Sequence, residues 1–273
     1  MIVLTPSRQL PFPVMAECIS PDVFQEKTLE EIGELAVWEG NKQKKLADLF
    51  KVEEQNREGE NEATITICGD VAEVRRIGAS MTIGEIMIEG NVGMHLGEEM
   101  KGGKITVHGN AESWAGSMMK GGTIEIYGSA GDYLGAPYRG CGEGMRGGQI
   151  VVHGDVGSEA GAYMKKGLLK IKGNAGQFAG LRMHGGTILV EGNCEARAGA
   201  CMTEGKIVVI GFLESVLPTF TIEGVRNKVK IKETDSIEGP FYIFSGDLAE
   251  RGNGKLYVSK RKNPHLSVFE KLL

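Results

Sequence analysis

A glycine-rich segment recurs along the middle of the chain, and this repeat restricts the fold more than any other feature. Each copy ends in a short alternating apolar run, such as KITVH or TIEIY, which predicts a β-strand with one buried face. No segment between these runs is long enough and free enough of glycine to form a crossover helix. The copies begin at nearly constant spacing, most often 19 residues, with Gly69, Gly90, Gly109, Gly128, Gly154, Gly173, Gly192 and Gly211.

One strand-bearing turn per copy predicts an all-β fold, specifically a right-handed parallel β-helix, or solenoid, with turns of about 19 residues. Both ends of such a stack are open sheet edges that need a cover. We therefore expect an N-terminal cap over residues 1–62, the glycine-rich repeats over 63–211, and irregular further rungs with a tail over 212–273. The pairs expected to face the interior are Ile86/Ile88, Ile105/Val107, Ile124/Ile126, Ile150/Val152, Leu169/Ile171, Ile188/Val190 and Ile207/Val209.

Methionines follow the same repeat. Their spacing predicts an interior ladder of flexible thioethers that fills space between turns, rather than a soft-metal site. The Asn or Asp that follows several leading glycines suits a tight turn and could form a second ladder of side chains between turns. The methionines of the expected ladder are Met81, Met100, Met119, Met145, Met164, Met183 and Met202, and the turn residues are Asn91, Asn110, Asp155, Asn174 and Asn193.

The composition argues against several classes of function. Lys and Arg number 31 against 36 for Asp and Glu, a net charge of −5, which is not the basic balance of a nucleic-acid-binding protein. Five cysteines form no CxxC pair, and their odd number argues against a complete disulfide framework, so we expect reduced thiols in a cytoplasmic protein. The N-terminus lacks a signal-peptide pattern, and no apolar run reaches membrane-spanning length, so we expect no membrane insertion.

No motif in the sequence predicts a reaction centre. The Lys104 region lacks the glycine and hydroxyl residue of a phosphate-binding loop, and GCGEG over 140–144 precedes another strand rather than a helix. Among the histidines, only His108 and His153 share a repeat position, and Cys194 and Cys201 lack further ligands in their turn. We therefore expect no catalytic, cofactor-binding or metal-binding residue in this chain.

Two features predict contacts with other proteins. The turn that begins at Gly128 has 26 residues instead of 19, and insertions in solenoids form loops that often lie on the binding face. Tyrosine and arginine, which favour interfaces, are concentrated there. Outward strand positions also become apolar late in the repeat, so either the C-terminal region or another subunit should cover them. The candidate contact residues are Tyr133, Pro137, Tyr138, Arg139 and Arg146 near the insertion, and Val151, Leu189 and Val208 on the strands.

The sequence also resembles known proteins. The turns GSAGDYLG…GGQIVV and GNAGQFAG…GGTILVEG resemble the C-terminal β-helix domain of the glutamate synthase large subunit. A chain of this length with WEGNKQKKLADLFKV before the repeats and FYIFSGDLAERGNGKLYVSK after them looks more like the C subunit of formylmethanofuran dehydrogenase. This resemblance covers nearly the whole chain.

The resemblance implies a non-catalytic scaffold within a complex that reduces CO2 reversibly and formylates methanofuran, the first step of methanogenesis from CO2. The tungsten- or molybdenum-pterin and the iron–sulfur clusters would then belong to other subunits, among them a catalytic and an amidohydrolase-like partner. Three alternatives remain: the C subunit of a formyltransferase/hydrolase complex, a glutamate-synthase-like module, and a stand-alone polysaccharide-active β-helix. The sequence does not distinguish a tungsten from a molybdenum enzyme, and does not say whether the insertion over 134–146 touches methanofuran.

Overall fold

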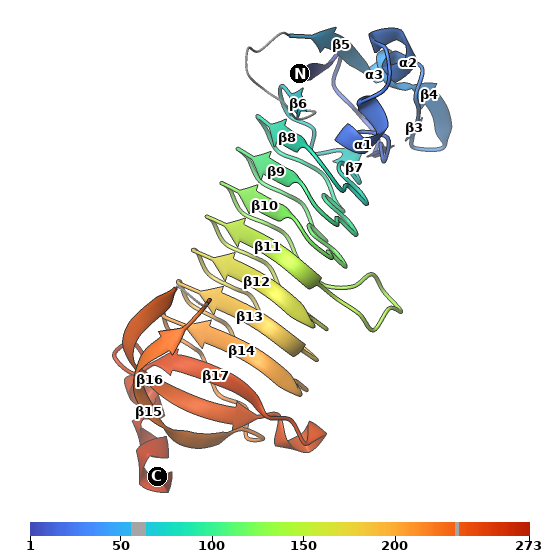
Figure 1. The fold of residues 1–273 in the computed structure, drawn as a ribbon. Helices are drawn as coiled ribbons and strands as arrows, with labels where there is room; N and C mark the ends of the chain where they lie inside the picture. The colour runs from blue at the N-terminus through green and yellow to red at the C-terminus, as the bar shows by residue number, and fades with distance from the viewer. Residues whose placement is uncertain (56–63, 233–234) are drawn as a thin grey trace.

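The computed structural model describes residues 1–55, 64–232 and 235–273. The protein is mostly β, with a mixed sheet of 13 strands and a second sheet of four strands. Figure 1 shows the strands of the large sheet stacked one after another along an elongated body, with the N- and C-terminal regions at opposite ends. The sheet expected from the repeat is therefore present, and the repeated segments form its middle.

Eight strands of the large sheet follow one another in parallel in sequence order. Ile86 pairs with Ile105, Ile105 with Ile124 and Ile124 with Ile150, so each step along the repeat places equivalent residues side by side. The expected inward pairs are confirmed, because every one of their side chains is fully buried. The strands are β6 (Thr64–Ile67), β8 (Glu85–Ile88), β9 (Lys104–Val107), β10 (Thr123–Ile126), β11 (Arg146–Val152), β12 (Lys166–Ile171), β13 (His184–Val190) and β14 (Glu204–Val209).

Backbone contacts also join the turns away from these strands. A second line of parallel bridges runs through Val71, Val92, Ala111, Ala130, Val156, Ala175, Cys194 and Leu213. Beside it, the expected polar ladder is present: the Asn174 side chain accepts a bond from the Asn193 N–H at 2.8 Å, and Asp155 accepts one from Asn174 at 2.6 Å. Because each turn is bonded to the next on more than one side, the spacing between turns is tightly fixed.

This close spacing explains the glycines and methionines. A Cβ atom on Gly121 would lie 2.2 Å from the backbone oxygen of Lys101 in the preceding turn, so no side chain fits there. A Cβ atom on Gly122 would lie 2.8 Å from the Met100 methyl group, which fills the adjacent space. All seven methionines of the expected ladder are fully buried.

The N-terminal region covers the first end of the large sheet. Strand β1 (Ile2–Pro6) pairs in parallel with β6 and antiparallel with β5 (Phe50–Glu54). The boundary that we expected between residues 62 and 63 lies outside the described residues. The rest of this region comprises the small sheet of β2 (Val14–Met15), β3 (Ala36–Glu39), β4 (Lys42–Lys45) and β7 (Val74–Arg75), and the short helices α1 (Pro21–Phe24), α2 (Leu29–Gly33) and α3 (Leu46–Leu49).

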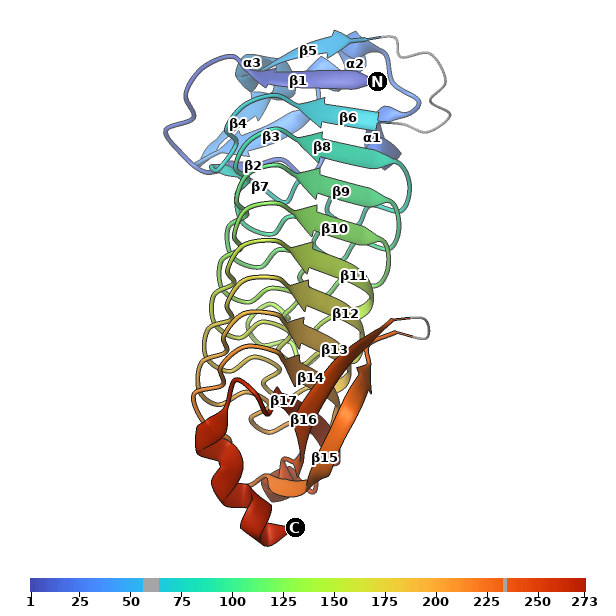
Figure 2. The same ribbon diagram turned by 90° about the vertical axis from the view of Figure 1, so that its left-hand side faces the viewer.

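The C-terminal region differs from the further rungs that we expected. Strand β17 (Gly254–Ser259) does continue the parallel stack beside β14. Strands β15 (Thr221–Lys230) and β16 (Ser236–Gly246) instead form an antiparallel hairpin, and Figure 2 shows this hairpin crossing the later strands of the stack. Two short 3-10 helices, Leu248–Glu250 and Pro264–Leu272, complete the region. No helix in the described part of the chain is long and apolar enough to cross a bilayer.

The hairpin forms because it buries the apolar outer surface of the stack. Val229, Ile231 and Phe241 pack in one cluster with Leu168, Leu189 and Val208 of β12–β14. Leu189 and Val208 are therefore covered by the C-terminal region of the chain itself, one of the two covers that we considered, whereas Val151 is not part of this cluster.

Candidate docking surface

The long turn projects from the stack between β10 and β11, and Figure 1 shows it as a loop that stands out from the regular turns. The loop is anchored at its base, where the Met145 N–H donates to the Gly135 oxygen at 2.9 Å and the Gly144 N–H donates to the Tyr163 oxygen at 3.0 Å. At its tip, a Cβ atom on Gly142 would meet nothing within 4 Å. The base is thus fixed and the tip faces solvent.

A column of aromatic rings lies against the base of this loop. His95, Trp114 and Tyr133 occupy equivalent places in three successive turns, all with φ of 63°. The His95 and Trp114 rings stack with centroids 5.4 Å apart, and the Trp114 and Tyr133 rings stack at 4.6 Å. Tyr138 of the loop is tilted over this column, 5.6 Å from His95 and 6.4 Å from Trp114. The loop and the column together form one aromatic surface.

Two cavities adjoin Tyr138. One of about 490 Å³ is lined by Trp114, Tyr133, Pro137, Tyr138 and Arg139 together with Tyr163 and Arg182 of later turns. The other, of about 390 Å³, is lined by Met15, Arg75, Arg76, His95, Glu98 and Tyr138. The buried Trp114 Nε1 and His95 Nδ1 atoms have no hydrogen-bond partner among the described residues. Unpaired polar atoms beside a cavity are costly, so this region retains unused hydrogen-bonding capacity.

Charged groups beside the second cavity are held close together. The Arg76 guanidinium lies 2.9 Å from a Glu98 oxygen and 2.8 Å from a Glu17 oxygen. Burial, and then the positive charges of Arg76 and Arg75, lower the pKa of His95. Burial raises the pKa of Glu98, although Arg76 opposes this shift. His95 is therefore held in its neutral form near neutral pH.

The predicted contact residues fall into two groups. Tyr133, Pro137, Tyr138 and Arg139 meet around one cavity, while Arg146 lies at the start of β11 and pairs with Glu143 at 2.7 Å. The strand positions Val151, Leu189 and Val208 are all buried. Leu189 and Val208 are not available to another subunit, because the β15–β16 hairpin covers them, and their proposed role as partner contacts is wrong for that reason.

Sequence reasoning missed the column itself. The signal was present, because His95, Trp114 and Tyr133 are each 19 residues apart, the period of the repeat. The outward histidines His108 and His153 also belong to a stack, with Tyr127 between them at 5.2 and 4.5 Å.

The described residues offer no obvious metal centre. They contain no group of three His, Cys, Asp or Glu side chains that could hold a metal ion. Burial raises the pKa of Cys194 to about 12 and that of Cys18 to about 11.

The fold and this surface together define a class: a mostly β protein of stacked turns whose most prominent feature is an aromatic loop of the kind found at protein interfaces. No protein-family model matches the chain. It is 44% identical over 96 residues to the C subunit of the tungsten-containing formylmethanofuran dehydrogenase 2 of Methanothermobacter marburgensis, covering 35% of this chain and 36% of that relative. It is 40% identical over 95 residues to the C subunit of the molybdenum-containing formylmethanofuran dehydrogenase 1 of Methanosarcina barkeri, covering 35% and 32%.

The matched segment thus spans about a third of the length of these curated relatives. A solved structure extends the similarity: a chain of the formyltransferase/hydrolase complex of Methylorubrum extorquens, determined with methylofuran, matches with a TM-score of 0.83 and 30% identity. That match covers 94% of this chain and 99% of the other. This chain belongs to the family that includes the C subunits of formylmethanofuran dehydrogenases of the tungsten and molybdenum types.

Proposed function

We propose that this chain is a non-catalytic structural subunit of a formylmethanofuran dehydrogenase complex, and that its stacked turns form a right-handed parallel β-helix that acts as the scaffold. The full-length match to a chain of an assembly of several subunits carries this proposal, because it covers 94% of this chain. A protein that shares its whole fold with one member of an assembly is suited to the same kind of role. The complex would work in the cytoplasm.

In this proposal the chemistry belongs to other subunits. A catalytic partner would hold the tungsten- or molybdenum-pterin, iron–sulfur clusters would carry electrons, and an amidohydrolase-like partner would complete the formylation of methanofuran. This chain would instead hold the catalytic subunits in a fixed arrangement.

The aromatic loop is the surface that we assign to docking. Tyr138 is half exposed and lies over the partly exposed rings of His95 and Trp114, which provides a large aromatic contact area. Arg139 adds an exposed cation at the rim of the cavity.

The test is to purify the affinity-tagged chain from its native cells and identify the proteins and metals that accompany it. We expect a pterin-metal subunit and an amidohydrolase-like subunit, with tungsten or molybdenum in stoichiometric amounts. A Tyr138→Ala/Arg139→Ala variant should lose these partners, whereas Gly142→Ala at the same loop tip should retain them. A monomer that carries no partner from its own cells would refute the scaffold role.

A second candidate is the equivalent subunit of a formyltransferase/hydrolase complex, which the full-length structural match favours. The same purification separates the two. A complex with formyltransferase and hydrolase activity but without tungsten or molybdenum would identify this alternative.

A further inference from the structure

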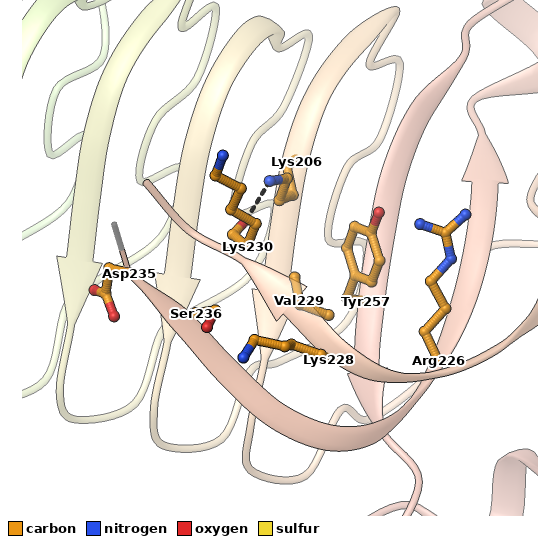
Figure 3. A pocket seen from close by; sticks show the side chains of 8 residues that line it. All are labelled: Lys206, Arg226, Lys228, Val229, Lys230, Asp235, Ser236 and Tyr257. Carbon is orange, nitrogen blue, oxygen red and sulfur yellow. Dashed lines mark hydrogen bonds between the residues drawn. The ribbon is translucent and has the colours of Figure 1, made fainter. Parts of the chain in front are cut away.

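A groove lies between the C-terminal hairpin and the outer surface of the stack, remote from the aromatic loop. Figure 3 shows the hairpin passing in front of the strands, with the side chains that line the space. The groove has a volume of about 640 Å³, and we call it the basic groove; its lining residues are Lys206, Arg226, Lys228, Val229, Lys230, Asp235, Ser236 and Tyr257. Val229 faces the apolar cluster beneath the hairpin, which holds the groove in shape.

Positive charge is concentrated in the basic groove, although the chain as a whole carries a net charge of −5. Four of its lining residues are cationic and one, Asp235, is acidic. Lys228 pairs with Glu238 at 3.0 Å, but in the described part of the chain Lys206, Arg226 and Lys230 have no ion pair. The Lys206 ammonium instead donates to the backbone oxygen of Lys230. Burial, and then the charge of Lys230, lower the pKa of Lys206.

The backbone around the groove is also incompletely paired. Strand β15 is the last strand in the order of the large sheet, with β16 on one side and no strand on the other among the described residues. Edge strands of this kind accept an added strand from another protein. Arg226, Lys228 and Lys230 are all exposed along this edge. The ladder shifts register between Arg226 and Lys228, whereas Lys228 and Lys230 lie in regular strand, where residues two apart are about 7 Å from each other.

We propose that the basic groove binds an extended, carboxylate-rich segment of a partner protein, which adds along the β15 edge. Charge complementarity identifies the occupant, because carboxylates on alternate residues of an extended peptide would have the same spacing as Lys228 and Lys230. A single small anion fits this arrangement less well, since the cations are distributed along a strand instead of converging on one point. The proposal rests on the proposed function in that the partner is another subunit of the same complex.

The first test uses the full chain and a defined probe, the peptide acetyl-Glu-Thr-Glu-Thr-Glu-Thr-Glu-amide. Binding is followed by calorimetry at low ionic strength, and hydrogen exchange is measured with and without peptide. We expect binding that weakens with added salt, and slower exchange of the β15 amides in the complex. An Arg226→Glu/Lys230→Glu variant should bind at least about tenfold more weakly, because two attractive charges become repulsive.

The matched control is Lys42→Glu/Lys44→Glu, which makes the same change in net charge on β4, an edge strand of the small sheet. This variant should bind the peptide as the unchanged protein does. An equal loss of peptide affinity in both variants would show that net charge alone attracts the peptide, and would overturn the proposal. The proposal would also be overturned if inorganic phosphate or a single-stranded oligonucleotide bound more tightly than the peptide, and if the Arg226 and Lys230 substitutions weakened that binding.

The second test uses the assembled complex. A carbodiimide joins lysine amines to carboxylates in direct contact, so it should link Lys206, Lys228 or Lys230 to Asp or Glu residues of one extended segment in another subunit. If these lysines stay unlinked, and an acetylating reagent still reaches them in a complex that retains its partners, the groove proposal fails and the scaffold role stands. If no partner subunit is present, it is the proposed function that fails.

Discussion

Substituting Gly121 by alanine should test directly whether the close spacing of the turns stabilises this fold. The added Cβ atom would lie 2.2 Å from the Lys101 oxygen, and ordinary contact begins near 3.4 Å, so the two turns must separate locally by about 1.2 Å. The obstacle is backbone rather than a flexible side chain and cannot rotate away. Gly121 does not have the left-handed conformation that penalises alanine, so the clash alone is measured.

The expected cost follows from the contacts at this position. Overfilling a closely packed site costs about 1–3 kcal/mol. The separation would also stretch the bonds that the Met100 oxygen accepts from the N–H groups of Lys120, at 2.7 Å, and Gly121, at 3.1 Å. Losing one of them costs about 1 kcal/mol. The lower entropy of an unfolded chain with alanine returns about 0.4–1 kcal/mol, which leaves a net loss of about 1–3.6 kcal/mol.

The assay is urea unfolding followed by circular dichroism, with hydrogen exchange to localise the effect, since stacked repeats can unfold in parts. Faster exchange should be concentrated in the turns on either side of Gly121. Gly142→Ala is the matched control, because nothing lies within 4 Å of its added Cβ atom, and it should keep only the entropic gain of about 0.4–1 kcal/mol. Equal stability of the two variants would refute the argument from turn spacing.

Three further predictions concern the interior, the polar ladder and His95. Met119→Ala should lose about 2–5 kcal/mol in urea unfolding because it leaves a cavity in a fully buried site, whereas Met119→Leu should lose less than about 1.5 kcal/mol. Asn174→Ala should cost about 1 kcal/mol or more, because the Asn193 N–H loses its acceptor at 2.8 Å; an Asp at position 174 should restore most of it. The lowered pKa of His95 means that the unfolded chain binds more protons below pH 6.5, so the stability should fall as the pH drops through that value toward the folded pKa. A His95→Gln variant should show a smaller fall in stability over this range, and an unchanged slope would contradict the burial of a neutral His95.

The repeated part of the fold could be predicted because one spacing determines several contacts at once. A period of 19 residues predicts that Ile105 lies beside Ile124 and that both face inward, and the structure has this register. The same period predicts the polar ladder through Asn174 and Asn193. In these turns the repeat spacing determines both the local strand pattern and the residues that pair between neighbouring turns.

Where the period stops, the sequence predicts strands but not their partners. The alternating run around Val229 predicts a strand, yet nothing local shows that it turns back on the stack to cover Leu189 and Val208. The aromatic surface was predicted only in part: the composition of the insertion drew attention to Tyr138, but its position over Trp114 depends on how the loop folds back. Side-chain contacts made by an irregular segment are not encoded in its spacing.

The return of the chain at β17 affects the order in which this molecule can fold. Most neighbouring strands of the stack are joined by a short connection, so that Lys104 pairs with Thr123. Lys206 pairs with Lys255 only after the whole hairpin has intervened. Closing this longer loop costs about 0.8 kcal/mol more in chain entropy than closing a regular turn, if the cost grows as (3/2)RT ln n with loop length n. Contacts between residues far apart in sequence form slowly. The β17 strand is therefore expected to pair late, after the hairpin has formed, and during synthesis the apolar strands beneath the hairpin would stay exposed until β15 and β16 are made.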